Sequence, residues 1–220
     1  MPDGMKAIGG VGNGVFEIVQ DLVGYENLCI FSFEEPELYA SLFEKVGQIL
    51  YEIWQWFLKN YSDVYCVCRF GDDLGYKSNT LLSHEDIRKH IIPQYARIVD
   101  LVHQYGRPFL LHSCGKIFAV MEDLIDAGVD ILNPIQPCSK DMNPVNLRDT
   151  YRNRIVFHGG LDTQEILPKC SPEQVAEEVR KLIDVFKPEG NYIFAAAHNI
   201  QTDVSAENID AMFTAAKKYK

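Results

Sequence analysis

The sequence lacks several features that would assign it at once to a class of protein. It has no excess of basic residues, because 21 Lys and Arg stand against 31 Asp and Glu and give a formal net charge of -10. Binding to nucleic acid or to an anionic membrane begins with a basic patch, so neither kind of partner is expected. Residues 1–6 lack the apolar core of a signal peptide, and the apolar runs are far shorter than a membrane span.

Cysteine is present but has no regular spacing. Six cysteines spread over 220 residues do not resemble the dense framework of a small disulfide-bonded protein. They are typical of reduced thiols, which indicates a cytoplasmic protein. The chain is 47% hydrophobic and 24% charged, which suits one globular domain, residues 1–220, with a substantial core.

Short apolar segments alternate with amphipathic segments along the chain. The apolar segments predict strands at residues 7–11, 64–68, 109–112, 129–132, 154–157 and 192–194. Three-and-four spacing of apolar residues and capping signals predict helices at residues 15–23, 27–31, 36–57, 83–102, 117–126, 143–151, 171–186 and 205–218. This alternation indicates βαβ units and a parallel sheet.

The number of strands limits the choice of fold. A closed (β/α)₈ barrel needs eight strands and usually about 250 residues. Five clear strands and a weaker one at residues 7–11 therefore predict an incomplete TIM-type barrel, roughly the last five or six βα units, without the first strands. A doubly wound sheet is the alternative.

The strand predicted at Phe109–His112 ends in a His-x-Cys-Gly motif. Residues two apart at the end of a strand point the same way, so the side chains of His112 and Cys114 can converge. Imidazole and thiolate are preferred ligands of zinc, and this pair would need a third ligand from elsewhere. The alternative is a buried cysteine beside a histidine that caps the next helix.

Other polar residues also follow predicted strands. They are Asp72, Asp73, Asn133, Gln136, His158, Asp162, His198 and Asn199. The carboxyl ends of parallel strands share one edge, which in a barrel is the usual place of the active site. We therefore expect one site at this edge, with His112 and His198 on the same side of the sheet.

Four segments carry a resemblance to a known family. They are His112-Ser113-Cys114-Gly115, Asn133-Pro134-Ile135-Gln136, Gly159-Gly160-Leu161-Asp162 and His198-Asn199-Ile200-Gln201, the last followed by Asp203-Val204 and Glu207-Asn208-Ile209. With them the chain resembles the uroporphyrinogen decarboxylase superfamily, in particular its cobalamin-dependent methyltransferase branch. The likeness runs from about Ala7 to the C-terminus and matches the later part of that family's barrel. The His-x-Cys-Gly motif resembles the zinc-binding methyltransferases rather than the heme-pathway decarboxylases.

The resemblance implies a zinc ion bound by a histidine, a cysteine and a later cysteine. Here the later segment reads Ala195-Ala196-Ala197-His198, so His198 is the expected third ligand beside His112 and Cys114. Cys138 and Cys170 are alternatives. The implied reaction is methyl transfer between a corrinoid and a thiol or a methoxy- or methylamine-type substrate, with a corrinoid protein as a candidate partner. Zinc would activate a thiol or polarise a donor oxygen at its open fourth position.

The remaining strand-end residues receive supporting roles. Asp72 and Asp162 are expected to assist catalysis, although each could simply cap a turn or helix. Asp73, Arg69, Asn133, Gln136 and Asn199 are expected to bind substrate.

Two other functions stay open. One is cofactor-free decarboxylation of the uroporphyrinogen type, which would need arginines to pair the substrate carboxylates; Arg69 is placed for that role. The other is a non-catalytic partner of a corrinoid protein.

Overall fold

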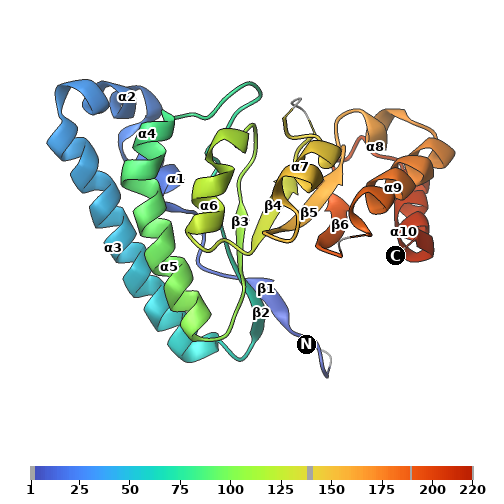
Figure 1. The fold of residues 1–220 in the computed structure, drawn as a ribbon, viewed down its shortest axis with the longest axis horizontal. Coiled ribbons are helices and arrows are strands. Elements are labelled where there is room, and N and C mark those ends of the chain that lie inside the picture. The colour runs from blue at the N-terminus through green and yellow to red at the C-terminus, as the bar shows by residue number, and fades with distance from the viewer. Residues whose placement is uncertain (1–2, 138–140, 189, 220) are drawn as a thin grey trace.

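The sheet of this protein is an open, curled half-barrel (Figure 1). The computed structural model describes residues 3–137, 141–188 and 190–219. Within them, six parallel strands pair in chain order. The strands are β1 Ala7–Gly9, β2 Tyr65–Gly71, β3 Phe109–His112, β4 Ile131–Ile135, β5 Val156–Leu161 and β6 Tyr192–Ala196. The prediction of an incomplete TIM-type α/β barrel is confirmed, and the alternative of a doubly wound sheet is wrong.

Helices connect the strands, and several of them begin at the proline and capping residues from which the sequence predicts a helix start. Their bounds are α1 Val15–Val23, α2 Tyr25–Glu34, α3 Pro36–Tyr61, α4 His84–Asp86, the π-helical η1 Ile87–Ile91, α5 Ile92–Gln104, the 3₁₀ turn η2 Phe118–Val120, α6 Met121–Asp126, α7 Pro144–Tyr151, α8 Ile166–Lys169, α9 Pro172–Phe186 and α10 Ala206–Tyr219. Proline opens α3 and α9, and Ser171 with Gln174 forms a capping box at the start of α9. Among the described residues, no helix is long and apolar enough to cross a bilayer.

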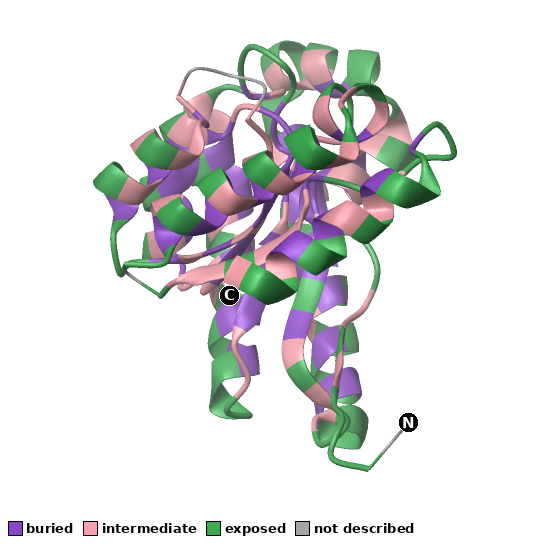
Figure 2. Cartoon of the chain, turned by 90° about the vertical axis from the view of Figure 1, so that its right-hand side faces the viewer, coloured by how far each residue is buried: buried purple, intermediate pink, exposed green. Residues whose placement is uncertain are grey.

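Two hydrophobic cores hold the half-barrel together. The larger one lies around β2 to β5 and their helices, and includes Trp54, which contacts the rings of Phe70 and Phe109. The smaller one joins α8, α9 and α10 to Leu161 at the end of β5. Buried and exposed residues lie on opposite faces of the helices (Figure 2).

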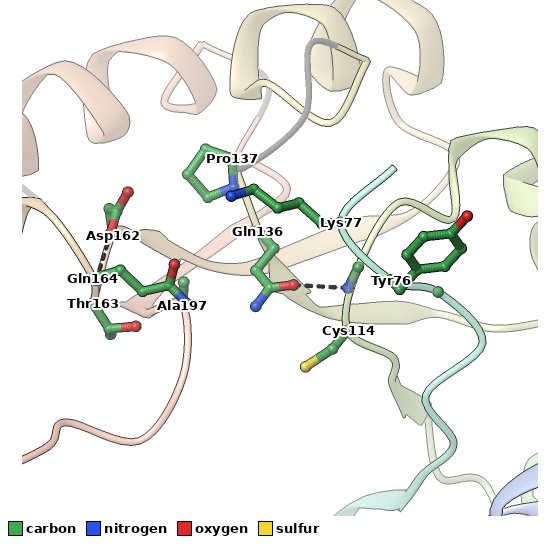
Figure 3. Close-up of a pocket in the computed structure, with 11 residues that line it drawn as sticks. Tyr76, Lys77, Cys114, Gln136, Pro137, Asp162, Thr163, Gln164 and Ala197 are labelled. Carbon is green, nitrogen blue, oxygen red and sulfur yellow. Dashed lines mark hydrogen bonds between the residues drawn. The ribbon is translucent and has the colours of Figure 1, made fainter. Parts of the chain in front are cut away.

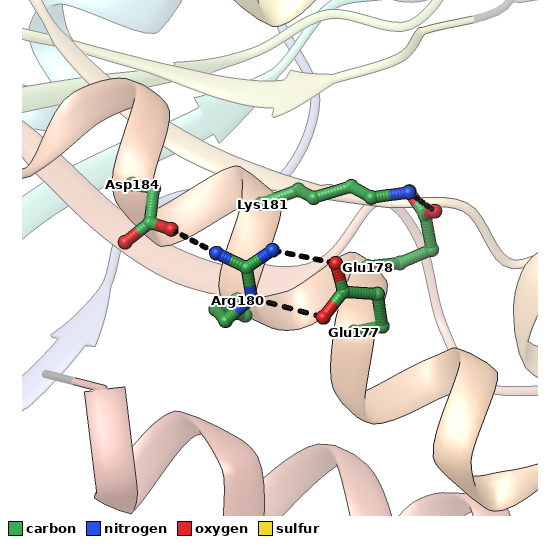
Figure 4. Close-up of polar contacts among 5 residues, drawn as sticks. All are labelled: Glu177, Glu178, Arg180, Lys181 and Asp184. Carbon is green, nitrogen blue, oxygen red and sulfur yellow. Dashed lines mark hydrogen bonds and ion pairs between the residues drawn. The ribbon is translucent and has the colours of Figure 1, made fainter.

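The outward face of α9 carries a network of ion pairs (Figure 4). Arg180 contacts Glu177 at 2.6 Å and Asp184 at 2.7 Å, and Lys181 contacts Glu178 at 2.6 Å. Such solvent-exposed pairs at i,i+3 and i,i+4 spacing add only weakly to the stability of a helix. They support α9 and do not face the strand ends.

One side of α3 stays exposed although it is apolar. Of the apolar residues at three-and-four spacing in this helix, Leu50, Trp54 and Phe57 are buried. Ile49 and Ile53 belong to the same pattern but are 44% and 42% exposed. The helical periodicity identifies an apolar stripe, but burial also requires a neighbouring element, and the open half-barrel supplies none there.

Candidate metal centre

The carboxyl ends of the strands bring the His-x-Cys motif and His198 together. Side-chain ligand atoms of His112, Cys114 and His198 all lie within 4.8 Å of one another. His112 Nε2 is 3.5 Å from Cys114 Sγ, and the ring centroids of His112 and His198 are 5.9 Å apart. These residues follow β3 and β6, so the curl of the sheet brings distant strands to one point.

The donor set fits zinc. Two imidazoles and one thiolate are ligands that zinc accepts at about 2.0–2.3 Å, which places them roughly 3–4 Å from one another. The distance of 3.5 Å between His112 Nε2 and Cys114 Sγ falls in this range, and all three ligand atoms lie within 4.8 Å of one another. Three protein ligands leave a fourth position for substrate.

Hydrogen bonds link three adjacent strands behind His112. Asn133 of β4 pairs with His112 in the sheet register, and its Oδ1 lies 2.7 Å from His112 Nδ1. The Nδ2 group of Asn133 contacts Nδ1 of His158 on β5. Burial, and then the positive charges of Arg69 and His112, lower the pKa of His158 and favour its neutral form. His158 follows the same edge pattern as the other residues, and the sequence gives it no specific role.

Two predicted substrate-binding residues hold the main chain of the motif. Asp73 Oδ1 accepts a hydrogen bond from the Cys114 N–H at 2.8 Å and lies 3.8 Å from His112 Nε2. Gln136 Oε1 accepts one from the Gly115 N–H at 2.7 Å. These contacts fix the direction in which the Cys114 side chain leaves the loop.

Asp72 points to the other face of the sheet, away from the ligand cluster. Its buried carboxylate accepts hydrogen bonds from the backbone of Phe16 at 2.9 Å and Glu17 at 2.7 Å, and from the Tyr95 hydroxyl at 2.6 Å. It therefore caps the N-terminus of α1. Burial raises the pKa of Asp72 to about 7, against the lowering effect of these hydrogen bonds.

Replacing Asp72 with alanine should destabilise the fold by about 2–4 kcal/mol, because three buried donors lose their acceptor. The free energy of unfolding of the wild type should also fall as the pH rises from about 4 to about 7. In this range the Asp72 carboxyl has already lost its proton in the unfolded chain but still holds it in the folded protein. Urea denaturation across this pH range measures both effects, and Asp72→Ala should flatten the slope. Asp63→Ala is the control, because that side chain is fully exposed; an equal change in both variants would contradict the prediction.

Three other predicted site residues lie on loops and turns outside the group of converging ligand atoms. Asp162 Oδ1 accepts hydrogen bonds from the backbone N–H groups of Gln164 at 2.6 Å and Glu165 at 2.9 Å, so it caps the turn before α8. Asn199 is exposed on the loop after β6. Cys170 lies next to α8, outside the group of converging ligand atoms, with Sγ 3.9 Å from a backbone oxygen. Cys138 lies outside the described residues.

Two cavities meet at the His-x-Cys motif. The smaller, of about 200 Å³, is lined on one side by Cys114 and Gln136 and on the other by Asp162 and Thr163, with Lys77 at its edge (Figure 3). The larger, of about 480 Å³, lies on the other side of the motif. Its polar lining residues are Asn13, Glu17, Arg69, Asp73 and His112.

The sequence motifs do not predict Lys77 and Thr163 as site residues. They stand in loops without a motif, and only the fold brings them to the smaller cavity.

Comparison with known proteins identifies the family. The sequence matches the profile described as uroporphyrinogen decarboxylase (URO-D) over residues 1–219. The chain belongs to the uroporphyrinogen decarboxylase family. The resemblance inferred from the sequence motifs is thereby confirmed.

Members of the URO-D family with different activities are similar to this chain. The uroporphyrinogen decarboxylase of Magnetococcus marinus is 26% identical over 63% of this chain and 38% of that protein. The methylcobamide:CoM methyltransferase MtbA of Methanosarcina acetivorans is 27% identical over 65% of this chain and 40% of that protein. A solved methyltransferase from Methanosarcina mazei shares the fold, with a TM-score of 0.78 and 16% identity over 100% of this chain and 60% of that one. The chain thus spans only part of the length of each.

Proposed function

We propose that this chain carries the metal centre of a zinc-dependent methyltransferase that moves a methyl group between a corrinoid and a thiol or a methoxy- or methylamine-type substrate. The observation that carries the proposal is the convergence of His112, Cys114 and His198 within 4.8 Å. A family relative named for transfer between methylcobamide and CoM supports the corrinoid as a reactant. In this proposal residues 1–220 form one barrel-type domain, and a corrinoid protein is the partner.

In such a reaction the residues around the centre would have two roles, binding the ion and holding the ligand-bearing loop. His112, Cys114 and His198 would hold the ion, which when bound supplies a Lewis acid that lowers the pKa of a substrate thiol. Asp73 and Gln136 keep the Cys114–Gly115 segment in place through its backbone N–H groups.

The two cavities suit a reaction with two substrates. The smaller one beside Cys114, about 200 Å³, has room for a small methyl acceptor or donor. Lys77, Thr163 and Gln136 offer it hydrogen bonds. The larger one, about 480 Å³, opens on the side of His112 and would receive the corrinoid-borne methyl group.

The decarboxylase alternative finds less support in the cavities. A tetrapyrrole with several carboxylates needs several cationic partners, and Lys77 is the one cationic residue among the described residues that line the smaller cavity. In the larger cavity Arg69 is accompanied by the carboxylates of Glu17 and Asp73. The alternative of a non-catalytic corrinoid-binding protein does not require three converging metal ligands.

Metal analysis of the purified protein tests the proposal. After loading with zinc and removal of weakly bound ions by dialysis, the wild type should retain stoichiometric zinc. The zinc-loaded protein should then consume methylcobalamin in the presence of a small thiol, which absorbance spectroscopy follows. A wild type that never retains zinc would overturn the methyltransferase proposal and favour the decarboxylase-like one.

A further inference from the structure

The side chain of Asn133 lies between two imidazole rings on neighbouring strands. Its Oδ1 is 2.7 Å from His112 Nδ1, and its Nδ2 contacts His158 Nδ1. His112, Asn133 and His158 come from β3, β4 and β5, so all three are held by the sheet. A carboxamide has one end that only accepts hydrogen bonds and one that only donates them.

With the Asn133 amide in this orientation, each neutral ring carries its proton on a defined nitrogen. A carbonyl oxygen cannot donate, so His112 Nδ1 must carry the hydrogen, and the lone pair of that ring is on Nε2. An amide nitrogen does not accept, so His158 Nδ1 must have a lone pair and its proton is on Nε2. His112 Nε2 is the nitrogen that lies 3.5 Å from Cys114 Sγ, on the side of the metal centre.

We infer that Asn133 and His158 are positioning residues that hold His112 in the tautomer able to bind a metal through Nε2. The inference rests on the metal site proposed above and assigns a role to residues outside the ligand set. Asn133 supplies the acceptor for His112, as carboxylates and carbonyls do for histidine ligands in many metal sites.

His158 is needed because a carboxamide has nearly the same shape when it is turned by 180°. In the turned orientation, Nδ2 would face His112, the ring proton would move to Nε2, and the ligand position would be blocked. The amide keeps the orientation that leaves His112 Nε2 open when His158 Nδ1 carries the lone pair, so the tautomers of the two rings are set together through Asn133. The predicted role of Asn133 in binding substrate is therefore replaced in this proposal by a role in orienting a ligand.

The tautomer can be measured directly in the metal-free protein. Long-range ¹H–¹⁵N spectra of ¹⁵N-labelled protein should show His112 protonated on Nδ1 and His158 protonated on Nε2. Asn133→Leu should convert His112 to a mixture of the two tautomers. Asn133→Asp should restore the Nδ1–H form of His112, because a carboxylate also accepts. A wild-type His112 protonated on Nε2 would overturn the inference.

Zinc titration gives a second readout. Asn133→Leu should weaken zinc binding roughly 10–100-fold, whereas Asn133→Asp should stay close to the wild type. Asn60→Leu is the matched control, since Asn60 is an exposed residue of α3 whose side chain bonds only its own helix; its affinity should not change. Equal affinity of Asn133→Leu and wild type would overturn the inference. A wild type without zinc would refute the proposed function, and the spectra of the metal-free protein would then decide the tautomer question separately.

Discussion

Replacing Cys114 with serine is expected to abolish zinc retention and methyl transfer while the fold persists. A serine hydroxyl is almost isosteric with the thiol but is a poor zinc ligand at neutral pH. Losing a direct ligand should weaken binding by more than the roughly 100-fold that follows from losing an outer hydrogen bond. The fold should survive because Asp73 and Gln136 hold the backbone of this segment and not the sulfur. Metal analysis and thermal unfolding of the metal-free protein measure the two properties.

The matched control is Cys170→Ser. Cys170 is also partly buried, but it lies beside α8 and not among the converging ligand atoms. Its variant should keep the zinc content of the wild type. Stoichiometric zinc in the Cys114→Ser protein would refute the proposed ligand set and return the preference to a decarboxylase-like function.

Replacing Gly115 with alanine should destabilise the protein by about 3 kcal/mol or more. Gly115 has φ +85°, a left-handed conformation that costs an L-residue energy. A Cβ atom there would also overlap the backbone of Gly75 and lie 2.5 Å from Tyr76 N, so the loop would have to move. Because the Gly115 N–H bonds Gln136 beside Cys114, zinc affinity should fall as well. Urea denaturation and zinc titration of the variant measure these losses.

Gly106→Ala separates the two causes. Gly106 has φ +66°, in the same backbone region, but no atom lies within 4 Å of an added Cβ. Its substitution should cost only about 1–2 kcal/mol, the penalty of the left-handed conformation alone. If both variants lost the same stability, overlap with the Gly75–Tyr76 backbone would not be the reason for the glycine in the His-x-Cys-Gly motif.

The fold and the meeting of the site residues could be predicted because their signals are local. Apolar runs fix the strands to within a few residues, and each polar cluster lies in the later part of a strand or directly after it. The parallel arrangement then brings these clusters to one edge. The meeting of His112 and His198 needed only the further assumption that the sheet curls.

The roles of individual residues depend on contacts that the local sequence does not show. Asp72 and Asp73 are adjacent and chemically identical, yet one caps α1 and the other holds Cys114. Strand alternation offered a signal for this difference. Asp72 lies two residues after buried Phe70 and so faces the same side of the strand, whereas Asp73 lies four residues after exposed Arg69 and faces the other side. The exposure of Ile49 and Ile53 could not be foreseen, since it depends on which elements neighbour α3.

The proposed metal ligands come from strands that pack against different hydrophobic cores. His112 ends β3 and Cys114 lies just after it, beside the larger core, whereas His198 follows β6, whose Phe194 and Ala196 pack against the smaller core of α8 to α10. Such packing units can open independently of global unfolding. A metal held by all three residues would act as a cross-link that couples the two units into one cooperative transition. Local opening of α9 and α10 would in turn be a route for release of the ion, and amide hydrogen exchange in these helices would then depend on metal occupancy.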